Sequence, residues 1–139
     1  MSIQSATPYF ILNGKVEHAI ALYQRALGAR VETLQRFGDV DRSCPDAQKQ
    51  RVMHAVLRVG NATLMMSDGP GEGPLPDGGS VNVALDLTSP EDTRRAFDQL
   101  AASGTVIEPI FDAPWGALFG VVRDEMGIQW MFNCAKGPR

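Results

Sequence analysis

The chain has 139 residues and a formal net charge of −3, from 13 basic and 16 acidic residues. A chain of this length can bury a core without disulfide or zinc crosslinks, and its 44% hydrophobic and 21% charged residues exclude wholesale disorder. No apolar run approaches the roughly 18 residues of a membrane helix. The first residues lack a signal-peptide pattern, and the basic residues form no stripe suited to nucleic acid. We therefore expect a cytoplasmic protein that binds neither nucleic acid nor a membrane.

The first half of the chain predicts four strands and one helix in the order β-α-β-β-β. Apolar residues at helical spacing indicate the helix, which follows an Asn13-Gly14 turn and ends where Gly28 can act as its C-cap. Gly60-Asn61 is typical of a two-residue hairpin turn. The expected elements are a strand at 7–12, the helix at 15–27, a strand at 29–37, a polar stretch at 38–50, and strands at 51–59 and 62–67.

The second half predicts the same order again. Ser89 is a typical N-cap residue with Pro90 at the first helical position, and Gly104 ends the helix. A turn at Gly127 separates the last two strands. The expected elements are a strand at 81–87, a helix from 89 to about 103, and strands at 105–111, 117–124 and 128–134.

This internal repeat predicts an α+β fold of two βαβββ modules within one domain, 1–139. The modules cover about 5–67 and 80–135, and a Gly- and Pro-rich linker at 68–79 joins them. Each module makes one sheet with a helix on one face, so pairing the modules should leave a concave cleft between the sheets. The residues that align between the two halves are Glu17 with Glu91, Tyr23 with Phe97, Gly28 with Gly104, and Gly60 with Gly127.

The alternation of side chains along each strand predicts which residues face the helix and which face the cleft. We expect the odd residues of 81–87 to pack under the helix, together with Met53, Ala55, Leu57, Val59, Trp130 and Phe132. The opposite side should carry the polar residues His54, Arg58, Asn82, Asp86, Gln129 and Asn133, among the apolar residues Phe10, Val56, Met66, Ala84 and Met131.

This plan resembles the vicinal oxygen chelate superfamily of glyoxalase, bleomycin-resistance and extradiol dioxygenase proteins, and within it the PhnB-like group. The resemblance covers nearly the whole chain. The residues that carry it are Thr7-Pro8-Tyr9, Val52-Met53-His54-Ala55, Leu64-Met65-Met66-Ser67-Asp68, Pro114-Trp115-Gly116 with Phe119-Gly120, and Asp124 with Gly127 and Trp130.

The resemblance implies a tandem-module fold with a cleft, and it implies positions at which relatives hold a divalent metal. Superfamily enzymes use His, Gln or Glu from the first and last strands of each module. Here those positions fall on Pro8, Leu64, Asn82 and Met131. Pro and Leu cannot ligate, Met suits soft ions, and a lone Asn carbonyl binds weakly. We therefore expect no metal and no other cofactor.

His54 is the candidate general base or hydrogen-bond donor of the cleft, because imidazole titrates near neutral pH. The alternative is a structural histidine held by a neighbouring carbonyl or carboxylate. Asn82 either binds a ligand amide or carboxylate or bridges two strands. Arg58 and Arg123 either clamp an anionic ligand or form salt bridges with Asp68 or Asp124.

The remaining candidates line the cleft or its rim. Trp115, in a loop, is expected to be a lid or a dimer contact, and Gln129 and Met131 are expected on the cleft wall. Residues 38–50 and 68–79 are expected to cover the cleft. Cys44 and Cys134 lack metal-ligand spacing and are expected to be free thiols, with no role that the sequence assigns.

The large concave faces, together with the resemblance, predict a homodimer whose modules pair either within one chain or across subunits. Its cleft should bind a small molecule, more readily a carboxylate or carbonyl compound than a cation, because its polar groups are mainly neutral or basic. Two other interpretations stay open. One is a lyase- or isomerase-type enzyme of the same superfamily with a metal held by other residues, such as His54 with Glu32 or Glu108. The other is a dimeric interaction module without a ligand.

Overall fold

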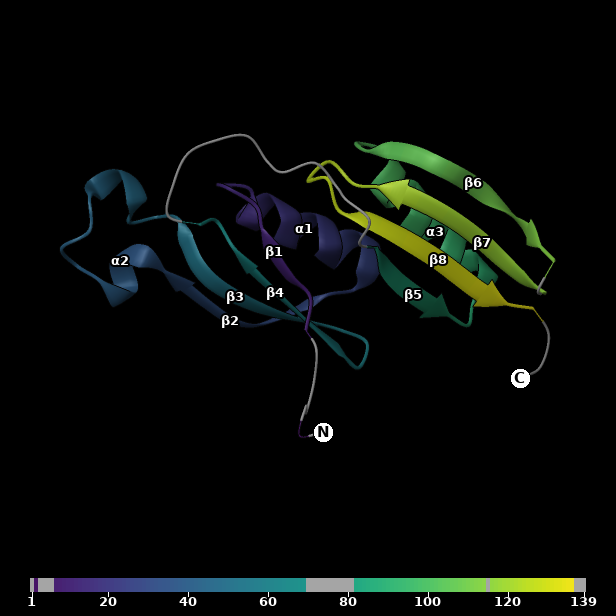
Figure 1. Ribbon diagram of the computed structural model, residues 1–139, viewed down its shortest axis with the longest axis horizontal. Helices are drawn as coiled ribbons and strands as arrows, with labels where there is room; N and C mark the ends of the chain where they lie inside the picture. The colour runs from purple at the N-terminus through teal and green to yellow at the C-terminus, as the bar shows by residue number, and fades with distance from the viewer. Residues whose placement is uncertain (1, 3–6, 70–81, 115, 137–139) are drawn as a thin grey trace. The chain divides into compact units, whose positions relative to one another are not determined.

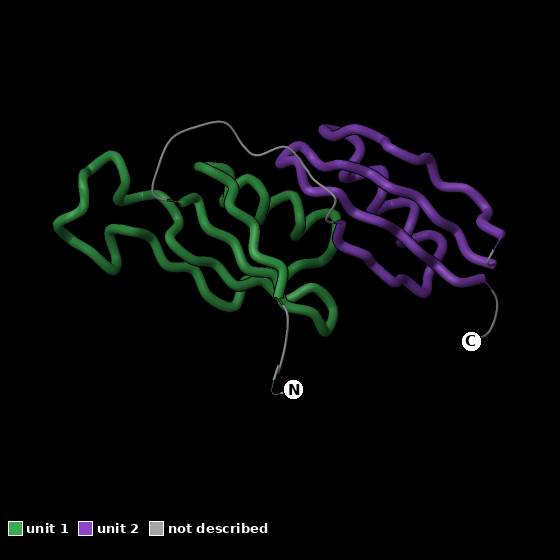
Figure 2. Tube along the Cα trace, in the orientation of Figure 1, with its two compact units in different colours: residues 1–75 green, residues 76–139 purple. Residues whose placement is uncertain are grey.

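The computed structural model describes residues 2, 7–69, 82–114 and 116–136. It contains the predicted βαβββ motif twice, each time as a four-stranded sheet with a long helix on one face (Figure 1). The chain divides into two units, 1–75 and 76–139, with one motif in each (Figure 2). The α+β class and the tandem modules are therefore confirmed, while their union in a single domain stays a prediction.

The first unit has strand order β1-β4-β3-β2, with β1 parallel to β4 and the other pairs antiparallel. Helix α1 buries an apolar stripe and ends at Gly28, which takes a left-handed conformation at φ 66°. The helix and strands are β1 (Tyr9–Ile11), α1 (Val16–Leu27), β2 (Arg30–Arg36), β3 (Val52–Val59) and β4 (Ala62–Ser67).

Between β2 and β3 the chain makes an excursion, residues 37–51, that extends beyond the end of the sheet (Figure 1). The sequence predicted only a polar stretch, but the excursion contains α2 (Phe37–Val40) and the 3-10 helix η1 (Asp46–Gln48). Its base is closed by the Gly38 amide, which donates to the Lys49 carbonyl at 3.1 Å. In its exposed tip, the Ser43 hydroxyl and amide donate to Asp41 and lower the pKa of that carboxyl.

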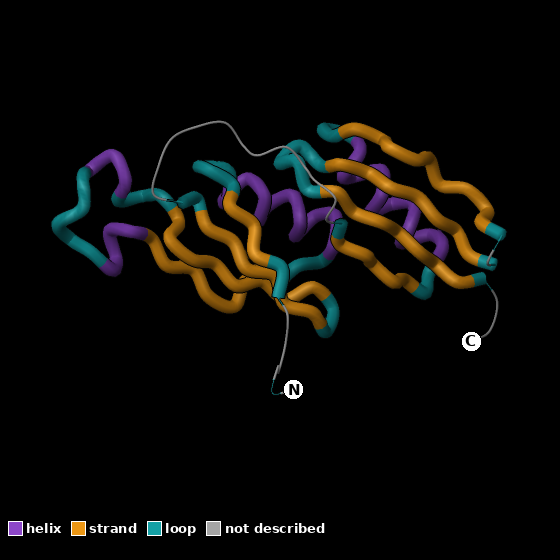
Figure 3. The backbone as a smooth tube through the Cα atoms, viewed as in Figure 1, coloured by secondary structure: helices purple, strands orange, loops and turns teal. Residues whose placement is uncertain are grey.

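The second unit repeats the arrangement with strand order β5-β8-β7-β6. The Ser89 hydroxyl caps α3 by accepting from the Asp92 amide at 3.2 Å. A Cβ atom at Gly104 would lie 2.2 Å from the Arg123 carbonyl oxygen, so only glycine fits where the chain leaves α3. The elements (Figure 3) are β5 (Val83–Leu87), α3 (Pro90–Ala101), β6 (Thr105–Ala113), β7 (Ala117–Arg123) and β8 (Gln129–Ala135).

Each sheet has a helix-covered face and an open face, and most of the predicted alternation is confirmed. Trp130 and Phe132 are fully buried, whereas Gln129, Met131 and Asn133 are half-buried on the other side of β8. In β5 the odd residues are half-buried and the even ones exposed. The period of two therefore identified the open face of the second sheet correctly.

In the first sheet the prediction was wrong at three apolar positions. Met53 is half-buried and Val52 is fully buried instead, because the β2–β3 pairing shifts register between Gln35 and Arg36. Phe10 and Met66, predicted to face the cleft, are paired with each other in the core, 8% and 0% exposed. The open face of β4 carries Thr63 and Met65 instead.

Asp68, which the sequence analysis assigned to the linker, belongs to the core of the first unit. Its side chain is buried, and its two carboxylate oxygens accept from the amides of Val16 at 3.0 Å and Val52 at 2.8 Å. It therefore fixes the first turn of α1 and the start of β3 to the end of β4. Residues 70–79 of the predicted linker lie outside the described residues.

Replacing Asp68 with Ala should destabilise the protein by about 2–4 kcal/mol, because two buried amides lose their acceptors. Urea unfolding followed by circular dichroism measures the change. Asp46→Ala removes a carboxylate from an exposed position and should stay within about 0.5 kcal/mol of the parent. Equal stability of the two variants would contradict the structural role of Asp68.

Candidate functional site

Three polar side chains form a chain of hydrogen bonds across the open face of the second sheet. Arg123 ends β7, Gln129 begins β8 beside it, and Asn82 lies just before β5. Arg123 Nη2 donates to Gln129 Oε1 at 3.0 Å, and Gln129 Nε2 donates to Asn82 Oδ1 at 2.6 Å. Each end of the Gln129 amide has its own partner, so the orientation of this side chain is fixed.

Arg123 keeps an unused donor. Its Nε atom is buried and has no hydrogen-bond partner among the residues that the structure describes. Buried donors are almost always paired, so this atom indicates a missing acceptor. Because Nε–H and Nη2–H lie along one edge of the guanidinium, that edge can bind a carboxylate with two hydrogen bonds.

An apolar floor adjoins this polar chain. Met131 is paired across the sheet with Val121 on one side and Ala84 on the other, and all three side chains lie on the open face. A ligand there would meet an apolar surface bordered by Arg123, Gln129 and Asn82 at one end and by Asp86 and Asn133 at the other. This combination is the usual form of a small-molecule site.

The open face of the first sheet carries a different polar pair. The Tyr9 hydroxyl lies 3.1 Å from His54 Nδ1, and the two ring centroids are 5.8 Å apart. Val56 and Met65, paired with each other beside Tyr9, form the apolar surroundings. A histidine whose Nδ1 is held by a hydroxyl group can still exchange a proton through Nε2.

The alternative proposed for the two arginines, salt bridges with Asp68 or Asp124, is wrong. Arg58 bonds Thr63 Oγ1 at 2.8 Å and pairs with Glu32 at 3.5 Å. The Asp124 carboxylate accepts from Trp130 Nε1 and two amides of the β7–β8 turn. Asp68 is likewise held by backbone amides, and the partners of Arg58 and Arg123 in the described chain are other residues.

The predicted site residues fall into two groups. One group, on the open face of the first sheet, is His54 and Arg58. The other group, at the open face of the second sheet, is Asn82, Gln129 and Met131. Trp115 lies outside the described residues. A ligand-binding role for these residues, and a single cavity shared by His54 and Asn82, stay predictions.

Tyr9 and Met65 also lie on the open face of the first sheet, which the sequence pattern did not predict. The run Leu64-Met65-Met66 is apolar throughout, so its alternation gives no sign of which side faces the helix. The pairing of β1 with β4, Tyr9 opposite Met65 and Phe10 opposite Met66, decides the question. A polar partner for His54 could have been sought at Tyr9, the hydroxyl-bearing residue of the first predicted strand.

Comparisons with known proteins agree with this fold. The model of the Glyoxalase/Bleomycin resistance protein/Dioxygenase superfamily matches residues 6–132. Protein YjdN of Escherichia coli (strain K12) is 32% identical over 140 residues, covering 94% of this chain and 95% of YjdN. The crystal structure of PA1353 from Pseudomonas aeruginosa is 34% identical with a TM-score of 0.84, covering 96% and 98% of the two chains. A PhnB protein from Bacillus cereus, 21% identical with a TM-score of 0.79 and coverage of 95% and 100%, shares the fold.

The side chains at the expected metal positions do not fit a divalent cation. Leu64 is buried on the helix-covered face, and the open-face residue beside it is Met65. Asn82 already accepts a hydrogen bond from Gln129. Glu32, named as another possible ligand, is ion-paired with Arg58, and no three His, Cys, Asp or Glu side chains gather within the described ranges.

Purified protein should therefore contain well below one divalent metal ion per chain. The side-chain donors at the expected metal positions are the thioether of Met131 and the amide of Asn82, which bind such ions weakly. Elemental analysis after gel filtration measures this content. Close to one zinc, nickel, manganese or iron per chain would contradict the prediction. In that case His54→Ala would show whether the imidazole holds the ion.

Proposed function

Because the chain belongs to the glyoxalase/bleomycin resistance protein/dioxygenase superfamily, we propose that it binds a small anionic or carbonyl-bearing molecule at the open faces of its sheets, without a metal ion. The observation that carries this proposal is the buried Nε of Arg123, which has no partner in the described part of the chain. A cationic ligand would leave that donor unpaired and face a like charge, whereas a carboxylate supplies the acceptor it lacks.

The groups around Arg123 on the second open face each have a part in such binding. Arg123 binds the carboxylate or carbonyl oxygen, and Gln129 holds the guanidinium in place through its 3.0 Å hydrogen bond. Asn82 fixes the far end of Gln129 and offers its own amide N–H groups to the ligand. Met131 and Val121 contact the apolar body of the ligand, which excludes water from the charged pair.

A lyase- or isomerase-type enzyme is the second candidate, and the contact between Tyr9 and His54 favours it. A hydroxyl at 3.1 Å from Nδ1 orients the imidazole, and it can either donate to Nδ1 or accept from Nδ1–H. His54 would then be able to move a proton on a bound carbonyl compound. A metal-dependent version of this enzyme would need ligands other than the residues at the expected positions.

A thermal-shift panel of small carboxylates, 2-oxo acids, phosphonates and amines of similar size tests the binding proposal. We expect anionic and carbonyl compounds to raise Tm and amines to have no effect. Arg123→Gln should weaken the best anionic compound roughly 10- to 100-fold, the loss of a charge-assisted bidentate contact.

Arg42→Gln is the matched control, because it removes an arginine from an exposed position in residues 37–51 and should leave affinity unchanged. Stabilisation by no anionic compound, or equal affinity in Arg123→Gln, would refute the proposal. Chemical conversion of a bound compound that His54→Ala abolishes, without loss of binding, would favour the enzyme.

We also propose that the protein is a homodimer. The edge strand β1 supports this, since Tyr9 and Ile11 are 47% and 49% exposed there and large exposed apolar residues on an edge favour association. Light scattering at micromolar concentration should give about 30 kDa, twice the 15.1 kDa chain. A particle of one chain mass would exclude the dimer.

A further inference from the structure

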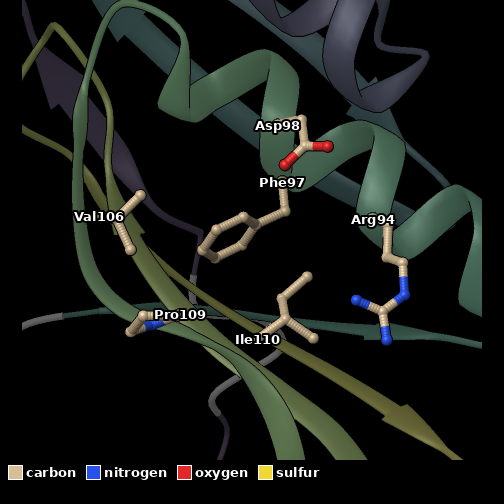
Figure 4. A pocket seen from close by; sticks show the side chains of 6 residues that line it. All are labelled: Arg94, Phe97, Asp98, Val106, Pro109 and Ile110. Carbon is tan, nitrogen blue, oxygen red and sulfur yellow. The ribbon is translucent and has the colours of Figure 1, made fainter.

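A hollow of about 370 Å³ lies between α3 and the edge strand β6 of the second unit (Figure 4). It is on the helix-covered side of the sheet, so it is separate from the open face that carries Arg123 and Gln129. Its volume is within the range of small-molecule sites. Its lining residues are Arg94, Phe97 and Asp98 from α3, and Val106, Pro109 and Ile110 from β6.

The floor of the hollow is apolar and closely packed. Phe97 is 4% exposed, and its ring lies between Val106 and Ile110 (Figure 4). A Cβ atom at Gly120 of β7 would lie 2.9 Å from both the Phe97 ring and Ile110 Cγ1. Because Gly120 has no side chain, Phe97 and Ile110 can pack closely against the sheet, and space remains above them.

Two opposite charges flank this floor. Arg94 and Asp98 are one helical turn apart on α3, both are exposed, and neither has an ion-pair partner among the described residues. Their order, cation before anion, is the less favourable one for pairing along a helix. Both heads are therefore available to a ligand that carries the complementary charges.

The first module lacks this arrangement. When Tyr23 is aligned with Phe97, Ile20 falls at the place of Arg94 and Gln24 at that of Asp98. Ile20 is only 8% exposed and Tyr23 is fully buried. The charged pair beside an aromatic floor is thus particular to the second helix and is not required by the shared fold.

We propose that this hollow binds a free hydrophobic α-amino acid. The carboxylate pairs with the Arg94 guanidinium, the ammonium group pairs with Asp98, and the side chain packs on Phe97, Val106 and Pro109. A zwitterion matches both charges at once, whereas a simple fatty acid or amine matches one. Because the charged groups are solvent-exposed, we expect a Kd on the order of 0.1–1 mM.

Backbone NMR of the ¹⁵N-labelled full chain, titrated with L-phenylalanine and L-leucine, tests the proposal. We expect saturable shifts at amides of α3 and β6, and these shifts give the Kd of the hollow. L-serine lacks the apolar side chain, and 3-phenylpropionate and phenethylamine each lack one charge, so each of these should bind at least about fivefold more weakly.

Arg94→Gln and Asp98→Asn should each weaken L-phenylalanine binding several-fold, and Val106→Trp should abolish it by filling the hollow at a 44% exposed position. Arg95→Gln, on the next residue of the same helix, should leave binding unchanged. The spectra of the variants also report whether each is folded. Absence of saturable shifts in α3 and β6, or equal binding by Arg94→Gln and the parent, would overturn the proposal.

Discussion

Two buried carboxylates, each accepting hydrogen bonds from backbone amides, hold the strand ends on which both modules depend. Asp68 joins the end of β4 to α1 and β3, and Asp124 closes the turn after β7 and bonds the indole of Trp130. A buried carboxylate is tolerated only when donors satisfy it, so these bonds allow little movement. Arg123 directly precedes Asp124 in the chain. The bonds of Asp124 therefore also hold the backbone that carries the Arg123 side chain.

The two-module plan could be predicted because the sequence signals for its helices and for its strands are both local. Helix spacing, Gly28 and Ser89 marked the helices, and the strands followed from alternation and turn residues. The errors have a physical origin in pairing between strands. Nothing in the sequence of β3 predicts the bulge that buries Val52 in place of Met53. In β4, the all-apolar stretch from Leu64 to Met66 has no alternation of polar and apolar residues.

The candidate site was predictable only as a set of residue types on one side of a strand. Parity placed Gln129 and Met131 on the open face of β8, where half-buried and buried residues alternate strictly. It could not show that Gln129 would join Arg123 to Asn82, nor that Arg123 Nε would find no partner within the described ranges. Those facts depend on the β7–β8 and β5–β8 registers, which link residues far apart in the sequence.

Strand β6 is irregular along its length, with register shifts on both sides of Glu108 and a proline at position 109. A proline has no amide hydrogen to offer a neighbouring strand, and a bulge breaks the even spacing that such a neighbour would need. Three large apolar residues are exposed on this strand and would otherwise favour association through its edge: Val106, Ile107 and Phe111. The distorted backbone thus disfavours edge-to-edge pairing of β6 with a strand of another chain.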